Sequence, residues 1–190
     1  KALRERFAAD LHDELGASLR SIGMLAEMAR EERTSPKTLA HLLVQIQDTT
    51  ASTLAATRYR IEKQTHPFKQ NLSGEMRRFS QRILADITWN LEIHGEEHLH
   101  NLKPTLTDDL MLFYKECLVN ISRHSKATEV KAILHATPKH VRLDVADNGE
   151  GLTSPPPSLQ RRARLMGGKL ATSSRDPRGT NITLTFRPKK

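Results

Sequence analysis

The sequence predicts two parts of different fold class, a long antiparallel helical hairpin followed by an α+β domain. Up to about residue 64, apolar side chains recur at steps of three and four, which is the spacing of one helix face. The character of the sequence changes around His66 and Pro67. Beyond that point, helical segments are mixed with segments of alternating apolar and polar residues, which are typical of strands. We therefore expect one domain at residues 1–65 and a second at residues 66–190.

The first part contains two predicted helices with a short break between them. One apolar stripe runs from Leu3 to Leu25 and a second from Leu39 to Ile61. Ser35 is a good N-cap for the second helix, and Pro36 is a good first helical residue. Two long helices joined by so short a turn form an antiparallel hairpin. A hairpin alone would leave its apolar stripe in water, so we predict a homodimer in which two hairpins form a four-helix bundle.

The second part combines helix and strand patterns without strict β–α alternation. The predicted helices cover residues 72–84, 107–122 and 159–165, and the predicted strands cover 86–93, 129–135, 140–146, 169–174 and 181–186. A turn at Thr137-Pro138-Lys139 joins two of these strands into an antiparallel hairpin. Helices mixed with antiparallel hairpins indicate an α+β sandwich.

Composition excludes several classes of protein. The chain has 190 residues with no apolar run near twenty residues, so we expect no bilayer span and no direct membrane contact. The single Cys117 rules out an internal disulfide framework and fits a cytoplasmic setting. The net charge of +8 is spread along the chain and only 4% of residues are aromatic, so we expect no nucleic-acid partner and keep a basic nucleic-acid-binding dimer as the less favoured alternative. The chain starts at Lys1 in a helical pattern, so we interpret it as a fragment of a longer protein, which could be membrane-anchored.

His12 is the first candidate for chemistry. It follows a stripe residue, so it should lie on the flank of the first helix, within reach of solvent and a partner domain. A neutral imidazole can attack phosphorus through one nitrogen if the other keeps its proton. Asp13 could hydrogen-bond that N–H and fix the tautomer. The alternative is an ordinary solvated histidine, because the chain has nine histidines and only the surroundings distinguish His12.

A second candidate group lies on the predicted helix at residues 107–122. Glu116, Asn120, Arg123 and His124 fall at positions i, i+4, i+7 and i+8, which places them on one helix face. A carboxylate and an amide on one face suit a magnesium ion that keeps most of its waters and bridges phosphates. The alternative is an ordinary polar helix face in water.

The third candidate is the string Asp147-Asn148-Gly149-Glu150-Gly151, which follows a predicted strand. Glycines permit close approach and backbone angles that other residues resist. A carboxylate at a strand end can accept a hydrogen bond from the exocyclic amine of adenine. The same letters also suit a hairpin turn. Gly179-Thr180, at the start of the last strand, could likewise be an ordinary turn after Asp176-Pro177-Arg178.

Together these motifs resemble the sensor histidine kinases of two-component signal transduction. Residues 6–16, Arg-Phe-Ala-Ala-Asp-Leu-His-Asp-Glu-Leu-Gly, are similar to the H-box of the subfamily in which Asp directly follows the phospho-accepting His. The resemblance covers essentially the whole chain. It implies a dimeric hairpin for dimerisation and histidine phosphotransfer, followed by a Bergerat (GHKL) α/β sandwich that binds ATP.

The resemblance also implies roles for individual residues. His12 would accept the γ-phosphoryl group of ATP with Asp13 as base, and would pass it to an aspartate of a response regulator receiver domain. Asn120 would hold Mg²⁺, and Glu116 would orient a water. The remaining implied nucleotide-binding residues are Arg123, His124, Asp147, Gly149, Gly151 and Thr180, the last supporting Asp147 through its hydroxyl.

The chain departs from the family pattern at the segment 152–158, where the family has a flexible lid over the phosphates. This segment contains three successive prolines, which stiffen a loop, and Ser158 stands where the family has glycine before the next helix. A catalytically inactive signalling scaffold therefore remains an alternative. Ala17 replaces the amide or imidazole that phosphatase-active members carry, so we expect phosphotransfer with weak or absent phosphatase activity.

Two further expectations concern less specific features. The receiver domain is expected to dock on the first helix below His12 and to bury Leu19 and Met24. His94 and His98 have the spacing of a helical metal pair. The preceding strand pattern and Gly95 favour a polar connection there instead. The sequence leaves open the stimulus, the cognate regulator and whether autophosphorylation runs within or between subunits.

Overall fold

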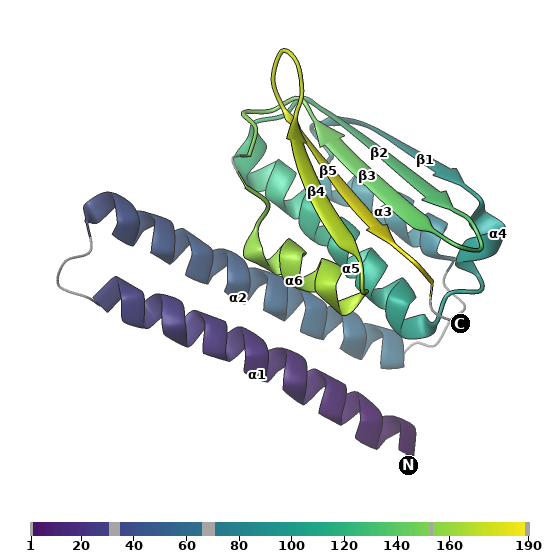
Figure 1. Cartoon of the computed structure of the whole chain (residues 1–190), viewed down its shortest axis with the longest axis horizontal. Coiled ribbons are helices and arrows are strands. Elements are labelled where there is room, and N and C mark those ends of the chain that lie inside the picture. Colours follow the sequence, from purple (N-terminus) through teal and green to yellow (C-terminus); the bar gives the residue numbers. More distant parts are fainter. Residues whose placement is uncertain (1, 31–34, 66–70, 153, 189–190) are drawn as a thin grey trace. The chain divides into compact units, whose positions relative to one another are not determined.

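The computed structural model of the chain describes the backbone of residues 2–30, 35–65, 71–152 and 154–188. The side chains of residues 2–11, 13, 14, 60 and 62–65 lie outside the description, and with them the beginning of the first apolar stripe. The chain divides into two compact units, residues 1–67 and 68–190. Figure 1 shows a pair of long helices in the first unit and a sheet with helices against one face in the second.

The first unit is a helical hairpin, as predicted. Helix α1 (Ala2–Arg30) and helix α2 (Pro36–Thr65) run antiparallel and pack against each other (Figure 1). The hydroxyl oxygen of Ser35 accepts a hydrogen bond from the amide of Thr38 at 3.2 Å, and its carbonyl accepts one from the amide of Leu39 at 2.8 Å. Ser35 therefore caps α2, and Pro36 is its first residue, which confirms both predictions.

The hairpin leaves much of its apolar surface exposed in the single chain. The exposed large apolar side chains on the two helices are Leu19, Met24, Met28, Leu39, Leu43, Val44, Leu54 and Ile61. Met24 is 67% exposed and Leu43 50% exposed. Apolar side chains gathered in this way mark an interaction surface more often than a solvated one.

The second unit contains four α-helices and one π-helix among its described residues. They are α3 (Leu72–Ile83), α4 (Glu96–Leu99), α5 (Pro104–Asn120), the π-helix η1 (Ile121–Ser125) and α6 (Pro157–Leu165). The side chain of Asn71 caps α3 by accepting from the amide of Ser73 at 3.0 Å. Helix α5 begins at Pro104 instead of Thr107, because a proline fits the first helical position, where no amide donor is needed.

The sheet has five strands in the order β1-β2-β3-β5-β4. The strands are β1 (Thr88–His94), β2 (Glu129–Ala136), β3 (Val141–Asp147), β4 (Lys169–Ser174) and β5 (Thr180–Phe186). Strand β1 runs parallel to β2, and all other neighbours are antiparallel. Helices α4 and α5 lie on the crossover between β1 and β2. The α+β sandwich is confirmed, although the parallel pair was not predicted.

Helices cover one face of the sheet, and the core lies between this face and the helices. Leu134, Leu143 and Leu184 are neighbours in register across β2, β3 and β5, and none has measurable exposure. Helix α5 is one of the helices on this face in Figure 1, and its Phe113 and Leu118 are equally buried. Along β3 the same inward row ends at Asp147, so a carboxylate occupies the last core position of this strand.

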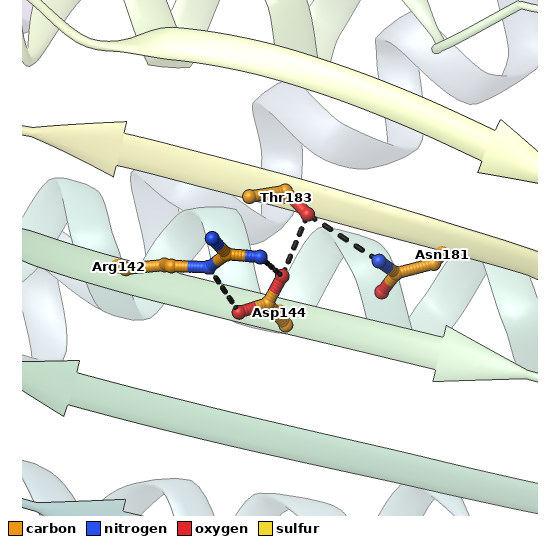
Figure 2. A network of polar contacts seen from close by, with 4 residues as sticks. All are labelled: Arg142, Asp144, Asn181 and Thr183. Carbon is orange, nitrogen blue, oxygen red and sulfur yellow. Dashed lines mark hydrogen bonds and ion pairs between the residues drawn. The ribbon is translucent and has the colours of Figure 1, made fainter.

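The opposite face carries polar side chains, four of which form a network in Figure 2. The guanidinium of Arg142 donates two hydrogen bonds to the carboxylate of Asp144, at 2.6 and 2.8 Å. The hydroxyl of Thr183 donates to the same carboxylate at 2.6 Å, and the amide of Asn181 donates to that hydroxyl at 3.4 Å. Arg142, and then Thr183 and Asn181, lower the pKa of Asp144 against the opposing effect of its partial burial.

The lowered pKa predicts a stability effect that depends on pH. The Asp144 carboxylate stabilises the fold above its ordinary pKa of 3.8, and this contribution is lost as the pH falls through the lower folded-state value. Asp144→Asn should therefore cost about 1 kcal/mol of unfolding free energy near neutral pH, which is less than a buried charged hydrogen bond contributes because Arg142 is exposed. Denaturant unfolding near neutrality and well below the ordinary pKa measures the difference. Asp86→Asn, in an exposed loop, is the control, and an equal loss at both pH values would contradict the prediction.

Candidate functional site

Asp147 is a buried carboxylate at the end of β3, with 4% of its surface exposed. Its Oδ1 accepts a hydrogen bond from the amide of Gly149 at 2.8 Å. Burial raises the pKa of Asp147, while the amides of Gly149 and Thr180 and the guanidinium of Arg175 act in the opposite direction. A carboxylate kept here against its desolvation cost is typical of a ligand-binding group.

The string Asp147–Gly151 is not a hairpin turn, because β3 pairs with β2 and β5 and is followed by α6. The hairpin alternative is therefore wrong. Asn148 instead anchors the string to the segment before β2. Its Oδ1 accepts from the amides of Thr128 and Glu129, both at 2.9 Å, and its Nδ2 donates to the hydroxyl of Thr128 at 2.9 Å.

Two glycines permit close approaches at this site. A Cβ atom on Gly149 would lie 2.2 Å from the carbonyl oxygen of Ser125, and one on Gly179 would lie 2.0 Å from the carbonyl oxygen of Asp147. Gly179 also has a φ of 116°, which side chains disfavour. It lies in the loop between β4 and β5, so it serves a turn and also packs against Asp147.

Thr180 lies opposite Asp147 in the register of β3 and β5 and is 1% exposed. Its hydroxyl oxygen accepts a hydrogen bond from the amide of Leu152 at 2.9 Å. The influence of Thr180 on the pKa of Asp147 comes through its backbone amide. The hydroxyl thus holds the start of the segment 152–158. Gly151, with a φ of 87°, faces Thr180 and Gly179.

The predicted face of Glu116, Asn120, Arg123 and His124 is only partly correct. Helix α5 ends at Asn120 and continues as the π-helix η1, in which hydrogen bonds span five residues and the turn is wider. Arg123 and His124 are exposed and do not continue the α-helical spacing, whereas Glu116 is only 8% exposed. A fully solvated polar face is therefore also wrong for Glu116.

The end of η1 joins this helix to the Asp147 string. The carbonyl of Ser125 accepts a hydrogen bond from the amide of Glu150 at 2.7 Å, and the Lys126 ammonium lies 2.6 Å from the Glu150 carboxylate. Lys126 has a φ of 53°, in the left-handed region that allows the chain to turn there. The Nδ2 atom of Asn120 is buried without a hydrogen-bond partner among the described residues. The structure thus brings together the two segments that the sequence predicts to bind a nucleotide.

The prolines of the segment 152–158 begin a helix. Pro156 is the N-cap of α6 and Pro157 its first residue, so α6 starts earlier than the predicted Leu159. Ser158 consequently lies inside the helix and not before it. Thr153 lies outside the described residues. Two of the three prolines therefore have a helix-starting role, which the expectation of a stiffened lid did not include.

Arg162 is a site residue that the sequence interpretation missed. Its Nε donates to Oε2 of Glu116 at 3.0 Å, and the two side chains are only 6% and 7% exposed. A signal was available in the sequence. Leu159, Arg162, Ala163 and Met166 share the i, i+3, i+4, i+7 face of α6, and all four are buried. A charge on an apolar face indicates a buried partner.

In the first unit, His12 lies on α1 with its side chain exposed, as expected. The side chain of Asp13 lies outside the described residues. Ala17 is half-buried on the same helix, and Leu19 is 64% exposed. These observations give His12 an accessible position on a helical hairpin.

Comparisons with known proteins agree with these features. Residues 4–66 match the family model HisKA_3, described as "Histidine kinase". The sensor histidine kinase LiaS of Bacillus subtilis (strain 168) is 27% identical over 195 residues, covering 94% of this chain and 52% of LiaS. The sensor histidine kinase DesK of the same organism is 28% identical over 148 residues, covering 77% of this chain and 39% of DesK.

The chain is a homologue of the sensor histidine kinases. The fold also matches a solved structure, the blue-light activated histidine kinase EL346 of Erythrobacter litoralis, with a TM-score of 0.52 and 13% identity over 96% of this chain and 60% of that chain. This histidine kinase homologue spans about half the length of the curated relatives LiaS and DesK, or less. In the described part of the homologue, no helix is both long and apolar enough to span a membrane.

Two other features, the segment His94–His100 and a cavity beside α6, contain none of the predicted nucleotide-binding residues. His94–His100 includes the short helix α4, with Gly95 at its N-cap, in place of a simple polar connection. No group of three or more metal-ligating side chains occurs among the described residues, which gives the His94–His98 metal pair no support. A cavity of about 470 Å³ between α6 and β4 is lined by Pro155, Gln160, Ala163, Arg164, Gly168 and Leu170.

Proposed function

We propose that this chain is the catalytic core of a sensor histidine kinase, which transfers the γ-phosphoryl group of ATP to His12. One observation carries the proposal. The same chain combines a hairpin that matches a histidine kinase family model and exposes His12 with a unit in which Ser125 joins the Asn120 helix to the Asp147 string. Neither half alone would indicate phosphoryl transfer to histidine.

The residues present fit a nucleotide with its metal. The Asp147 carboxylate is buried at the end of β3, where two glycines let the backbone carbonyls of Ser125 and of Asp147 itself approach closely. This carboxylate would accept a hydrogen bond from the exocyclic amine of adenine. The side-chain oxygen of Asn120 would hold Mg²⁺, and Nδ2 of the same amide, which is buried without a partner among the described residues, would donate a hydrogen bond to the nucleotide. Arg123 and His124 are exposed just beyond it and would lie near the phosphates, as would Gly151 at the start of the lid segment. A metal ion held there would neutralise the charge of the phosphates.

The chemical step would take place at the imidazole of His12. The lone pair of one ring nitrogen forms a bond to the γ-phosphorus, while the bond from phosphorus to the bridging oxygen breaks and ADP leaves. The other nitrogen keeps its N–H directed at Asp13, which assists as base by stabilising the developing positive charge. The exposure of His12 supports this role, because the second unit must reach the ring.

The phosphoryl group would then pass to an aspartate of a response regulator receiver domain. Leu19 and Met24, which are 64% and 67% exposed on α1 beyond His12, would become buried when that domain docks. Ala17 supplies neither an amide nor an imidazole to position a water near the phosphoryl group, so phosphatase activity would be weak or absent. This chemistry, together with the single Cys117, which is buried and has no disulfide partner, fits a cytoplasmic location for this part of the protein.

The proposed kinase acts as a homodimer in which exposed apolar side chains of two hairpins, Leu43 among them, form a four-helix bundle. Leu43→Lys should convert the dimer to a monomer. Burying a leucine contributes about 1.5–3 kcal/mol, and a two-fold interface contains each residue twice. Sedimentation or light scattering measures the change. Gln47→Lys, at an exposed polar position of α2, should leave the dimer intact. A Leu43→Lys protein that remains dimeric would show that Leu43 does not lie in the dimer interface.

The activity itself is tested by incubating the chain with γ-labelled ATP and Mg²⁺. We expect label that is stable to base and labile to acid, as an N–P bond to imidazole is, and that disappears when EDTA removes the metal. Folded dimeric protein that binds ATP but never becomes labelled would favour the inactive scaffold. Protein that neither binds ATP nor becomes labelled would reject the nucleotide site as well.

A further inference from the structure

The buried ion pair between α5 and α6 has no role in the function proposed so far. Arg162 is 5% exposed and Glu116 8% exposed, and Nε of Arg162 lies 3.0 Å from Oε2 of Glu116. The two residues are 46 positions apart in the sequence. They connect the helix that follows the lid segment to the helix that ends at Asn120.

Stability alone is a poor reason for such a pair. Removing two charges from water costs several kcal/mol per ion, and replacing a buried pair by apolar residues is often neutral or stabilising. The surroundings on α6 are apolar, since Leu159 and Ala163 on the same face are buried. An apolar residue at position 162 would fit that face equally well. The pair therefore points to a requirement for a fixed carboxylate at Glu116.

The position of Glu116 on α5 indicates which part of the site a fixed carboxylate could serve, namely the end of the helix at Asn120. Glu116 lies one helical turn before Asn120, on the same side of α5. The planar guanidinium of Arg162 has a rigid set of donors and stays charged, so it holds a carboxylate in one orientation more firmly than a lysine does. Because Arg162 belongs to α6, the orientation of Glu116 also depends on where the helix after the lid lies.

We propose that Arg162 is a positioning residue for phosphoryl transfer, which holds the carboxylate of Glu116 beside the metal-holding end of α5. Arg162 acts through Glu116 and does not itself contact the nucleotide. This inference rests on the proposed kinase function and adds a residue and a coupling to it. Movement of α6 on nucleotide binding would change the orientation of Glu116 directly.

The test compares Arg162→Met, Arg162→Lys, Glu116→Gln and the double variant Glu116→Gln/Arg162→Met in the dimeric chain. Single-turnover labelling at saturating ATP and Mg²⁺ gives the transfer rate, and calorimetry gives the nucleotide affinity. Arg162→Met should lower the rate about 10- to 100-fold, as loss of a second-layer partner does. Nucleotide affinity should stay within about twofold of the parent. Arg162→Lys should keep part of the rate that Arg162→Met loses, because lysine keeps the positive charge but lacks the planar set of guanidinium donors.

The double variant separates positioning from independent effects. If Arg162 acts through Glu116, the double variant should be no slower than Glu116→Gln, to within about twofold. Arg164→Met, on the exposed side of the same helix, is the matched control and should label like the parent.

Three results would each overturn the proposal. The double variant could lose rate by the product of the two single losses, Arg162→Met could label like the parent, or Arg162→Met could lose as much nucleotide affinity as rate. If Arg162→Met does not fold, Arg162→Lys and the uncharged double variant decide in the same way. A parent chain that never labels would instead reject the proposed function, which is a different outcome.

Discussion

His12→Gln is expected to abolish labelling from γ-labelled ATP while leaving nucleotide binding unchanged. Glutamine keeps a polar side chain of similar reach but has no ring nitrogen with a lone pair for phosphorus. The side chain of His12 is exposed, so the substitution should change the unfolding free energy by no more than about 0.5 kcal/mol. Gel-based detection of acid-labile label, with calorimetry for ATP, measures both effects.

The control for this experiment is His41→Gln, because His41 is exposed on the other helix of the hairpin. This variant should label like the parent chain. Label that persists at the parent level in His12→Gln would show that another of the nine histidines, or another residue type, accepts the phosphoryl group.

Asp147→Asn should weaken ATP binding by about 2 kcal/mol, which corresponds to about 30-fold in dissociation constant. The asparagine oxygen can still accept from the amide of Gly149, but its NH₂ group then faces the amine of adenine, where an acceptor is needed. Calorimetric titration with ATP measures the loss. Asp176→Asn, in the exposed loop between β4 and β5, should bind ATP like the parent.

The same substitution should stabilise the nucleotide-free fold. Burial raises the pKa of Asp147, so its ionised form opposes folding at pH values above the folded-state pKa. Asp147→Asn removes that cost, and the gain should vanish as the pH falls below the ordinary value of 3.8, where the carboxyl is protonated in both states. A variant that is less stable near neutral pH would contradict a binding role for Asp147 and indicate a structural one. Stability gained with function lost is typical of a binding site.

Local patterns predicted the elements well where the chain's own periodicity decides the structure. Ser35 and Pro36 define the start of α2, and β4 has the predicted bounds Lys169–Ser174. The hairpin exposes apolar side chains, for which the sequence predicts a partner hairpin in a second chain. The spacing of apolar residues depends only on residues within one element, and the start of α2 and the bounds of β4 are determined at that level.

Features that depend on distant partners were not predicted. Parallel pairing of β1 with β2 depends on a crossover, which alternation within a strand does not reveal. The π-helix after Asn120 ends at Ser125, which contacts the Asp147 string, and it breaks the face expected for Arg123 and His124. The partner of Arg162 lies 46 residues away, so only the misplaced charge on the apolar face of α6 hinted at it.

The most direct test of the account is to map the phosphorylated residue after incubation with ATP and Mg²⁺, by mass spectrometry under basic conditions that preserve phosphohistidine. The account predicts one modified imidazole, at His12, and much less of this modification in Asp147→Asn protein at ATP concentrations below saturation. Phosphate on serine, threonine or a different histidine, or a His12 that stays unmodified in protein that binds ATP, would contradict it.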